Sequence, residues 1–100
     1  MLAMNRSDFS EENDVVAWLI LGYLCSHPHA KDTVEGVGSW WLNGEGIDVE
    51  TEVVRVSLDY LVNLGWLTAV ECHAGVTVYA LNQNRRHMLQ RFLQSHVRAH

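Results

Sequence analysis

The chain has few basic residues, few cysteines and no long apolar run. Seven Lys and Arg residues stand against twelve Asp and Glu residues, which gives a formal net charge of −5. A protein that coats nucleic acid through charge alone needs the opposite sign, so the composition excludes that class. The two cysteines, Cys25 and Cys72, are too few for a disulfide framework. We interpret both as free thiols in the core of a protein from a reducing compartment.

The longest apolar run, Val15 to Cys25, is far shorter than the roughly 20 residues that cross a bilayer. One arginine and four carboxylates precede it, so the positive segment of a signal peptide is missing. We therefore expect a cytoplasmic protein with no membrane contact. The 100 residues are 48% hydrophobic and 19% charged, which is typical of one small globular domain. Residues 1–10 are expected to form a flexible N-terminus.

The first predicted helix covers residues 11–26 and is apolar around its whole circumference. Ser10 supplies an N-cap oxygen, and Pro28 ends the helix because it lacks a backbone donor. Since every side of the segment from Val15 to Leu21 is apolar, we expect burial on more than one side. Two interpretations stay open: the helix is the centre of the core, or one face is buried in a homodimer.

Two further helices are predicted before the chain becomes extended. The second covers residues 33–43, with Asp32 as its cap, and the third is capped by Asp48 and runs to about Leu64. Trp40 points about 100° away from the apolar stripe of the second helix. Its indole is therefore a candidate partner contact, unless it packs under a neighbouring loop.

Beyond Gly65 the apolar period changes from helical to extended. Trp66 to Cys72 and Val76 to Leu81 are predicted to be the strands of a β-hairpin, joined by the short turn of residues 73–75. The amphipathic residues 83–100 form a last helix, a possible dimerisation element. We place the candidate dimer interface at Trp18, Leu21, Leu89, Phe92 and Leu93.

This order of elements resembles the winged helix-turn-helix family. Leu58 to Leu67 looks like the end of a recognition helix, followed by glycine and an apolar pair, and Val76 to Leu81 looks like a wing that closes on Tyr-x-Leu. The last helix is similar to the dimerisation helix of PadR-like and MarR-like bacterial regulators. Residues 32–42 also look like a block in small uncharacterised bacterial winged-helix proteins. The resemblance implies a mainly α fold with a small β-hairpin wing over residues 11–82, and a DNA-binding transcription regulator.

The charge pattern departs from what DNA binding requires of such a fold. Residues 31–59 hold two basic residues against seven acidic ones, and Glu50 and Glu52 lie where the recognition helix would meet phosphates. The hairpin turn contains no Lys or Arg. Positive charge is concentrated instead in residues 71–100, which hold four arginines and one glutamate.

Two functions therefore stay open for this chain. The first is a transcription regulator, whose candidate DNA contacts are Thr51, Arg55, Arg85 and Arg86. The second is a protein-interaction module that has the same fold without DNA binding, whose candidate partner contacts are Trp40, Glu50 and Glu52.

No catalytic, metal or cofactor site is expected. Cys25, His27 and His29 are residue types that zinc accepts, but their spacing matches no standard zinc module. Gly36 and Gly38 lie within a predicted helix, so they do not form a phosphate-binding loop after a strand. No nucleophile motif or paired carboxylates stand out. We expect a non-enzymatic protein without cofactors.

Overall fold

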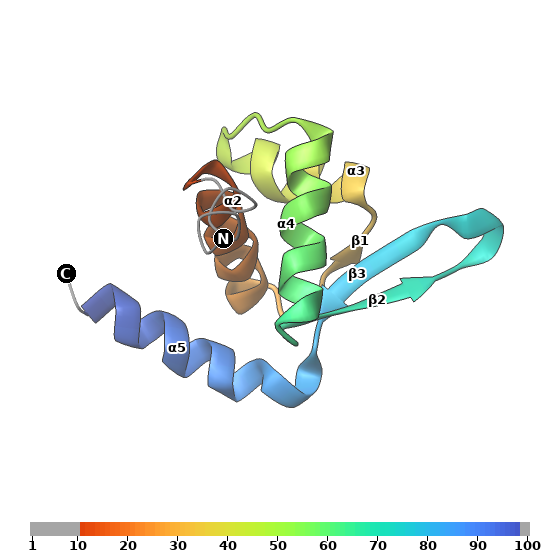
Figure 1. Ribbon diagram of the computed structural model, residues 1–100. Helices are drawn as coiled ribbons and strands as arrows, with labels where there is room; N and C mark the ends of the chain where they lie inside the picture. The colour runs from red at the N-terminus through yellow and green to blue at the C-terminus, as the bar shows by residue number, and fades with distance from the viewer. Residues whose placement is uncertain (1–10, 99–100) are drawn as a thin grey trace, which may run out of the picture.

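The computed structural model describes residues 11–98, and side chains within residues 15–44 and 46–94 (Figure 1). The predicted flexible N-terminus, residues 1–10, lies outside the described residues. The elements in chain order are α2 (Glu11–Ser26), β1 (Lys31–Asp32), α3 (Val34–Gly36), the π-helical η1 (Val37–Leu42), the 3-10 turn η2 (Asn43–Glu45), α4 (Thr51–Asn63), β2 (Leu67–Glu71), the turn η3 (His73–Gly75), β3 (Thr77–Leu81), the 3-10 turn η4 (Gln83–Arg85) and α5 (Arg86–Arg98).

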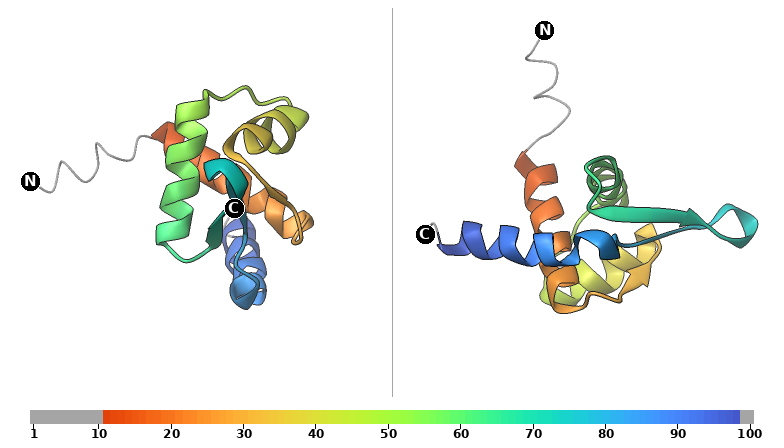
Figure 2. Two further views of the ribbon diagram at one scale, coloured as in Figure 1. Left: turned by 90° about the vertical axis from the view of Figure 1, so that its right-hand side faces the viewer. Right: turned by 90° about the horizontal axis from the view of Figure 1, so that it is seen from below.

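Helix α2 is the central helix of the core. Val16, Ile20 and Leu24 are buried along one side of it, where α4 and η1 pack (Figures 1 and 2). The expected bounds of this helix, residues 11–26, are confirmed. The buried apolar side chains form one cluster: Val16, Ala17, Ile20, Leu21, Leu24, Val37, Trp41, Leu42, Val54, Leu58, Leu61, Leu67, Tyr79, Leu81 and Leu89.

The second helical segment changes its winding along its length. It begins as one α-turn at Val34, becomes π-helical over η1 and ends in the 3-10 turn η2. Thr33 is the N-cap and its side chain accepts a hydrogen bond from the Gly36 backbone, so the expected cap at Asp32 is wrong by one position. Asp32 instead accepts a hydrogen bond from the backbone of Thr33, at 2.8 Å.

Helix α4 begins later than expected. Its N-cap is Glu50, whose side chain makes no capping hydrogen bond, so the predicted cap at Asp48 is wrong. Val54, Leu58 and Leu61 are buried on its inner side. The helix ends where Gly65 adopts a left-handed conformation at φ +89°, which residues other than glycine rarely adopt.

The sheet has three antiparallel strands in the order β1-β3-β2. The predicted hairpin is confirmed, and β1 is a strand that sequence patterns did not indicate. It pairs only with Ala80 and Tyr79, so the outer half of the hairpin has two strands and projects from the body as a wing (Figure 1). The expected fold class, mainly helical with a small β wing, is confirmed.

Helix α5 follows the hairpin and lies across α2 (Figure 2). Asn82 caps η4, the 3-10 turn that precedes α5, through its side chain. Leu89 is fully buried, and the Phe92 ring stacks on Trp18 of α2 with centroids 5.4 Å apart. Within residues 11–98, no helix is long and apolar enough to cross a membrane.

Candidate recognition surface

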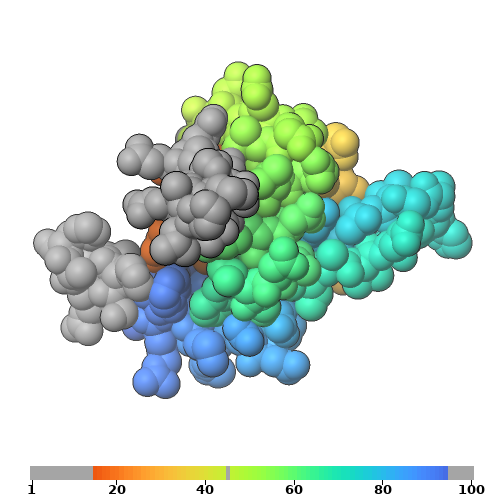
Figure 3. Space-filling model, viewed as in Figure 1, coloured from red at the N-terminus to blue at the C-terminus, as the bar shows by residue number. Residues whose placement is uncertain are grey.

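The exposed side of α4 and the wing lie on one face of the molecule (Figure 3). Thr51 and Glu52 are exposed in the first turn of α4, and Arg55 is exposed one turn later. The opposite side of the helix is fixed in the core by Val54 and Leu58. This face therefore presents the charged side chains of α4 to any partner.

Two carboxylates surround Arg55, the one basic residue in the sequence of α4. Its Nη2 atom forms an ion pair with Glu52, and its Nη1 atom lies 3.5 Å from the Asp59 Oδ2 atom. Residues three and four positions apart are neighbours on a helix, which explains the geometry. The hydrogen bond and charge of Glu52 raise the pKa of the Arg55 guanidinium above its ordinary value, and the Asp59 charge adds to this effect. The surface of α4 is therefore acidic despite its arginine.

Asp59 also connects this surface to the wing. The Tyr79 hydroxyl of β3 donates a hydrogen bond to the Asp59 Oδ1 atom, at 3.2 Å. Burial raises the pKa of the Tyr79 hydroxyl, and the Asp59 charge raises it further. The sequence analysis did not identify Asp59, although its position four residues after Arg55 is a signal that could have found it.

The Arg85 side chain interacts with other parts of the same chain. Its Nη1 atom donates to the Leu64 carbonyl oxygen at 3.1 Å, and its guanidinium carbon lies 5.8 Å from the centroid of the Trp66 ring. The guanidinium thus satisfies an unpaired carbonyl group at the end of α4. Arg86, the first residue of α5, is half-buried. Of the three arginines among the candidate DNA contacts, Arg55 and Arg85 therefore already have partners within the chain.

The candidate partner contacts differ in whether their side chains already interact within the chain. Trp40 is 72% exposed and lies on the outer side of η1, opposite the buried Val37 and Trp41, so it does not pack under a loop. Glu50 is exposed at the start of α4, whereas Glu52 is paired with Arg55. An exposed indole and an exposed carboxylate therefore remain available to a partner.

The residues expected at a dimer interface fall into two groups. Leu21 and Leu89 are buried within the chain itself. Trp18, Phe92 and Leu93 keep part of their surface exposed. The Phe92 ring lies between two indoles, stacked on Trp18 and tilted against Trp66, each at 5.4 Å. Part of this set therefore stabilises the single chain, and the rest stays accessible along α2 and α5.

Both cysteines are free thiols, but the expected core placement is wrong: Cys25 is half-buried, and Cys72 is exposed because it lies at the tip of the wing. Among the described side chains, no group of three His, Cys, Asp or Glu residues is placed to hold a metal ion. No family model, curated protein or solved structure matches the chain.

Proposed function

We propose that this protein is a non-enzymatic interaction module whose α4 surface binds a basic segment of a partner protein. The observation that carries the proposal is that Arg55 forms ion pairs with both Glu52 and Asp59. With its cation neutralised and Glu50 exposed at the start of α4, this surface attracts lysine and arginine side chains and repels phosphates.

The wing supports a protein partner over DNA. A wing that follows a DNA backbone needs basic or hydrogen-bonding side chains, and residues 66–81 contain no Lys or Arg. Val70 and Val76 are exposed on it instead. Trp40 adds an exposed aromatic side chain, the type enriched where protein interfaces concentrate their binding energy.

The test is a binding titration of the full chain against a labelled peptide of about ten residues rich in Lys and Arg. We expect saturable, salt-sensitive binding, because the attraction is between exposed charges. Glu50→Lys reverses a charge without breaking a side-chain capping bond, and should weaken binding about fivefold to tenfold. Gln94→Lys, which adds a positive charge at an exposed position of α5, is the control and should change binding less.

A DNA-binding transcription regulator is the second candidate. The juxtaposition of α4 and the wing on one face favours it (Figure 3), as does the exposed Thr51 in the first turn of α4. The same titration with mixed-sequence duplex separates the two functions. Duplex binding that is tighter than peptide binding and falls steeply with salt would support the regulator, and no duplex binding at about 50 mM salt would exclude it.

We also propose that the protein is a cytoplasmic homodimer joined through α2 and α5. Val15 and Trp18 on α2 and Met88 on α5 are exposed apolar side chains that a second copy would cover. The free thiols of Cys25 and Cys72 support a reducing compartment.

A further inference from the structure

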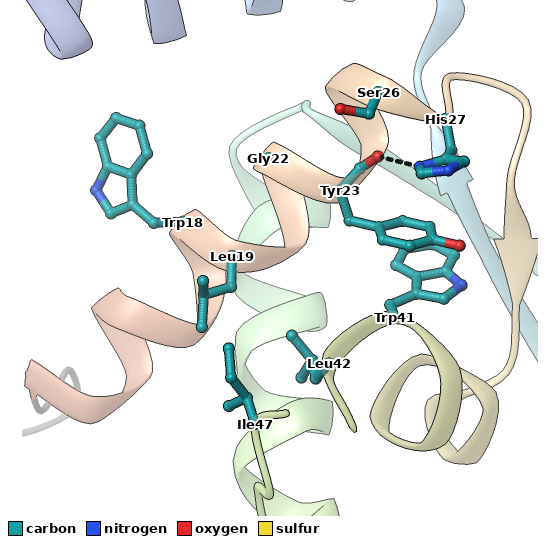
Figure 4. A pocket seen from close by; sticks show the side chains of 9 residues that line it. All are labelled: Trp18, Leu19, Gly22, Tyr23, Ser26, His27, Trp41, Leu42 and Ile47. Carbon is teal, nitrogen blue, oxygen red and sulfur yellow. Dashed lines mark hydrogen bonds between the residues drawn. The ribbon is translucent and has the colours of Figure 1, made fainter. Parts of the chain in front are cut away.

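A cavity opens between α2 and the segment that runs from η1 to Ile47 (Figure 4). Its volume is about 350 Å³, within the range of small-molecule sites. Trp18, Gly22 and Tyr23 of α2 line it, with Trp41 and Leu42 of η1 and Ile47 of the following loop. This cavity does not include any residue of the α4 surface, so an inference about it is independent of the proposed basic partner. It shares only Trp18 with the proposed dimer interface.

Gly22 leaves open the part of the cavity between Trp18 and Tyr23. Glycine weakens the interior of a helix and is tolerated there when another backbone packs closely. No such contact exists here, because a Cβ atom added at Gly22 would meet no atom within 4 Å. Any larger side chain at this position would instead project into the cavity, which Gly22 lines together with Trp18 and Tyr23.

One wall of the cavity is a stack of three rings. Figure 4 shows the Tyr23 ring between His27 and Trp41; its centroid lies 4.3 Å from His27 and 4.9 Å from Trp41. The interplanar angles are 17° and 10°. The His27 Nδ1 atom donates to the Tyr23 carbonyl oxygen at 3.2 Å, and Trp41 is buried. The wall is therefore held in place before any ligand arrives.

The lining determines the chemistry of the ligand. None of the nine lining residues carries a carboxylate, an amine or a guanidinium. Ser26, His27 and Tyr23 supply the polar groups, and Leu19, Leu42 and Ile47 supply apolar surface. A charged ligand would lose its hydration here without gaining a counter-charge. An uncharged aromatic molecule loses little hydration and gains contacts with the rings.

We propose that this cavity binds an uncharged aromatic molecule of one or two rings that carries a hydroxyl or similar polar group. The rings and apolar side chains bind its body, and the polar groups of Ser26, His27 or Tyr23 bind its polar substituent. The shape of the site depends on Gly22, because a large side chain there would fill part of the space that glycine leaves open.

The experiment titrates the full chain with 2-naphthol and follows the indole N–H signals by NMR. We expect saturable shifts for Trp18 and Trp41 and none for Trp40, which does not line the cavity. Gly22→Leu should weaken 2-naphthol binding at least tenfold while the Tm stays equal or rises, because leucine favours the helix. Gly44→Ala is the matched control: the added Cβ again meets no atom within 4 Å, outside the cavity, so binding should persist.

The charge requirement is tested with 2-naphthoate, which has the same two rings and a carboxylate. We expect its binding to be at least tenfold weaker than that of 2-naphthol. The proposal is wrong if 2-naphthol does not saturate the wild-type chain, or if Gly22→Leu binds it as tightly as the wild type. Equal binding of the two probes would overturn the assignment of an uncharged ligand.

Discussion

Arg85 joins segments that are 21 residues apart in the chain. It donates to the Leu64 carbonyl oxygen and lies over the Trp66 ring. Gly65 is required at this junction because its φ is +89°; a Cβ atom there would also lie 2.9 Å from the Arg85 guanidinium carbon and would displace that group. One basic residue that a charge count assigns to a partner surface is therefore part of the fold.

We predict that Arg85→Met lowers the free energy of unfolding by about 1 kcal/mol, because a carbonyl loses its hydrogen bond and Trp66 loses its cation. In a chain of 100 residues this corresponds to a fall in Tm of roughly 4–8 °C. Arg91→Met, an exposed change on α5, is the control and should stay within about 0.5 kcal/mol. Equal Tm values for the two variants in thermal denaturation would show that Arg85 is not a cap.

Single residues were predictable where the signal is local. Gly65 as a helix stop and Asn82 as a cap follow from their own residue types. Asp32 and Thr33 are both good capping residues, so sequence could not decide which of two adjacent positions begins the helix. The role of Arg85 could not be found, because its partners are brought near only by the hairpin between them.

Helices and strands were predicted reliably where the apolar residues follow a regular pattern along the sequence. The bounds of α2 and the strands of the wing follow from an apolar run and from alternation, respectively. Strand β1 has only two residues, too few for any period, and it exists because β3 offers it a free edge. The changing winding of η1 likewise leaves no trace in the sequence, because its buried residues Val37 and Trp41 also fit an ordinary helix.

The hydrogen bond between Tyr79 and Asp59 links β3 to α4 and makes stability depend on pH. The pKa of Tyr79 is raised in the folded protein, so the folded state holds the hydroxyl proton more tightly than the unfolded state does. The resulting stability is fully present below the ordinary tyrosine pKa of 10.0 and is lost as the pH rises through the raised value.

We therefore predict that Tyr79→Phe is less stable than the wild type by about 1 kcal/mol at pH 7, since it lacks the hydrogen bond. The difference should shrink above a pH of about 10, where the wild type loses its advantage and phenylalanine does not titrate. Urea denaturation of both proteins at neutral and alkaline pH measures this. A difference that stays constant across that range would contradict the coupling.

For the whole molecule, the sequence predicted which segments are acidic or basic, but it did not predict the cavity that distant segments form together. The acidic segment 31–59 does contribute the exposed side of α4, so this part of the candidate surface was found from residue counts. The ring-lined cavity was not, because it combines α2 with η1 and a loop about 20 residues away along the chain. The spacing of Trp18 and Gly22, one helical turn, was its only local signal.

The proposed homodimer depends on exposed apolar side chains of α2. Val15 and Trp18 are one turn apart on α2 and are 56% and 39% exposed, so a second copy packed on this side of α2 would cover both. We predict a molar mass near twice 11.4 kDa in light scattering at micromolar concentration. Val15→Glu should halve that mass, because it buries an unpaired carboxylate in the interface. Val70→Glu, at a wing position that is 58% exposed, is the matched control and should remain a dimer. A wild-type mass of 11.4 kDa would rule out this assembly, and a wild-type dimer that Val15→Glu leaves intact would place its interface elsewhere.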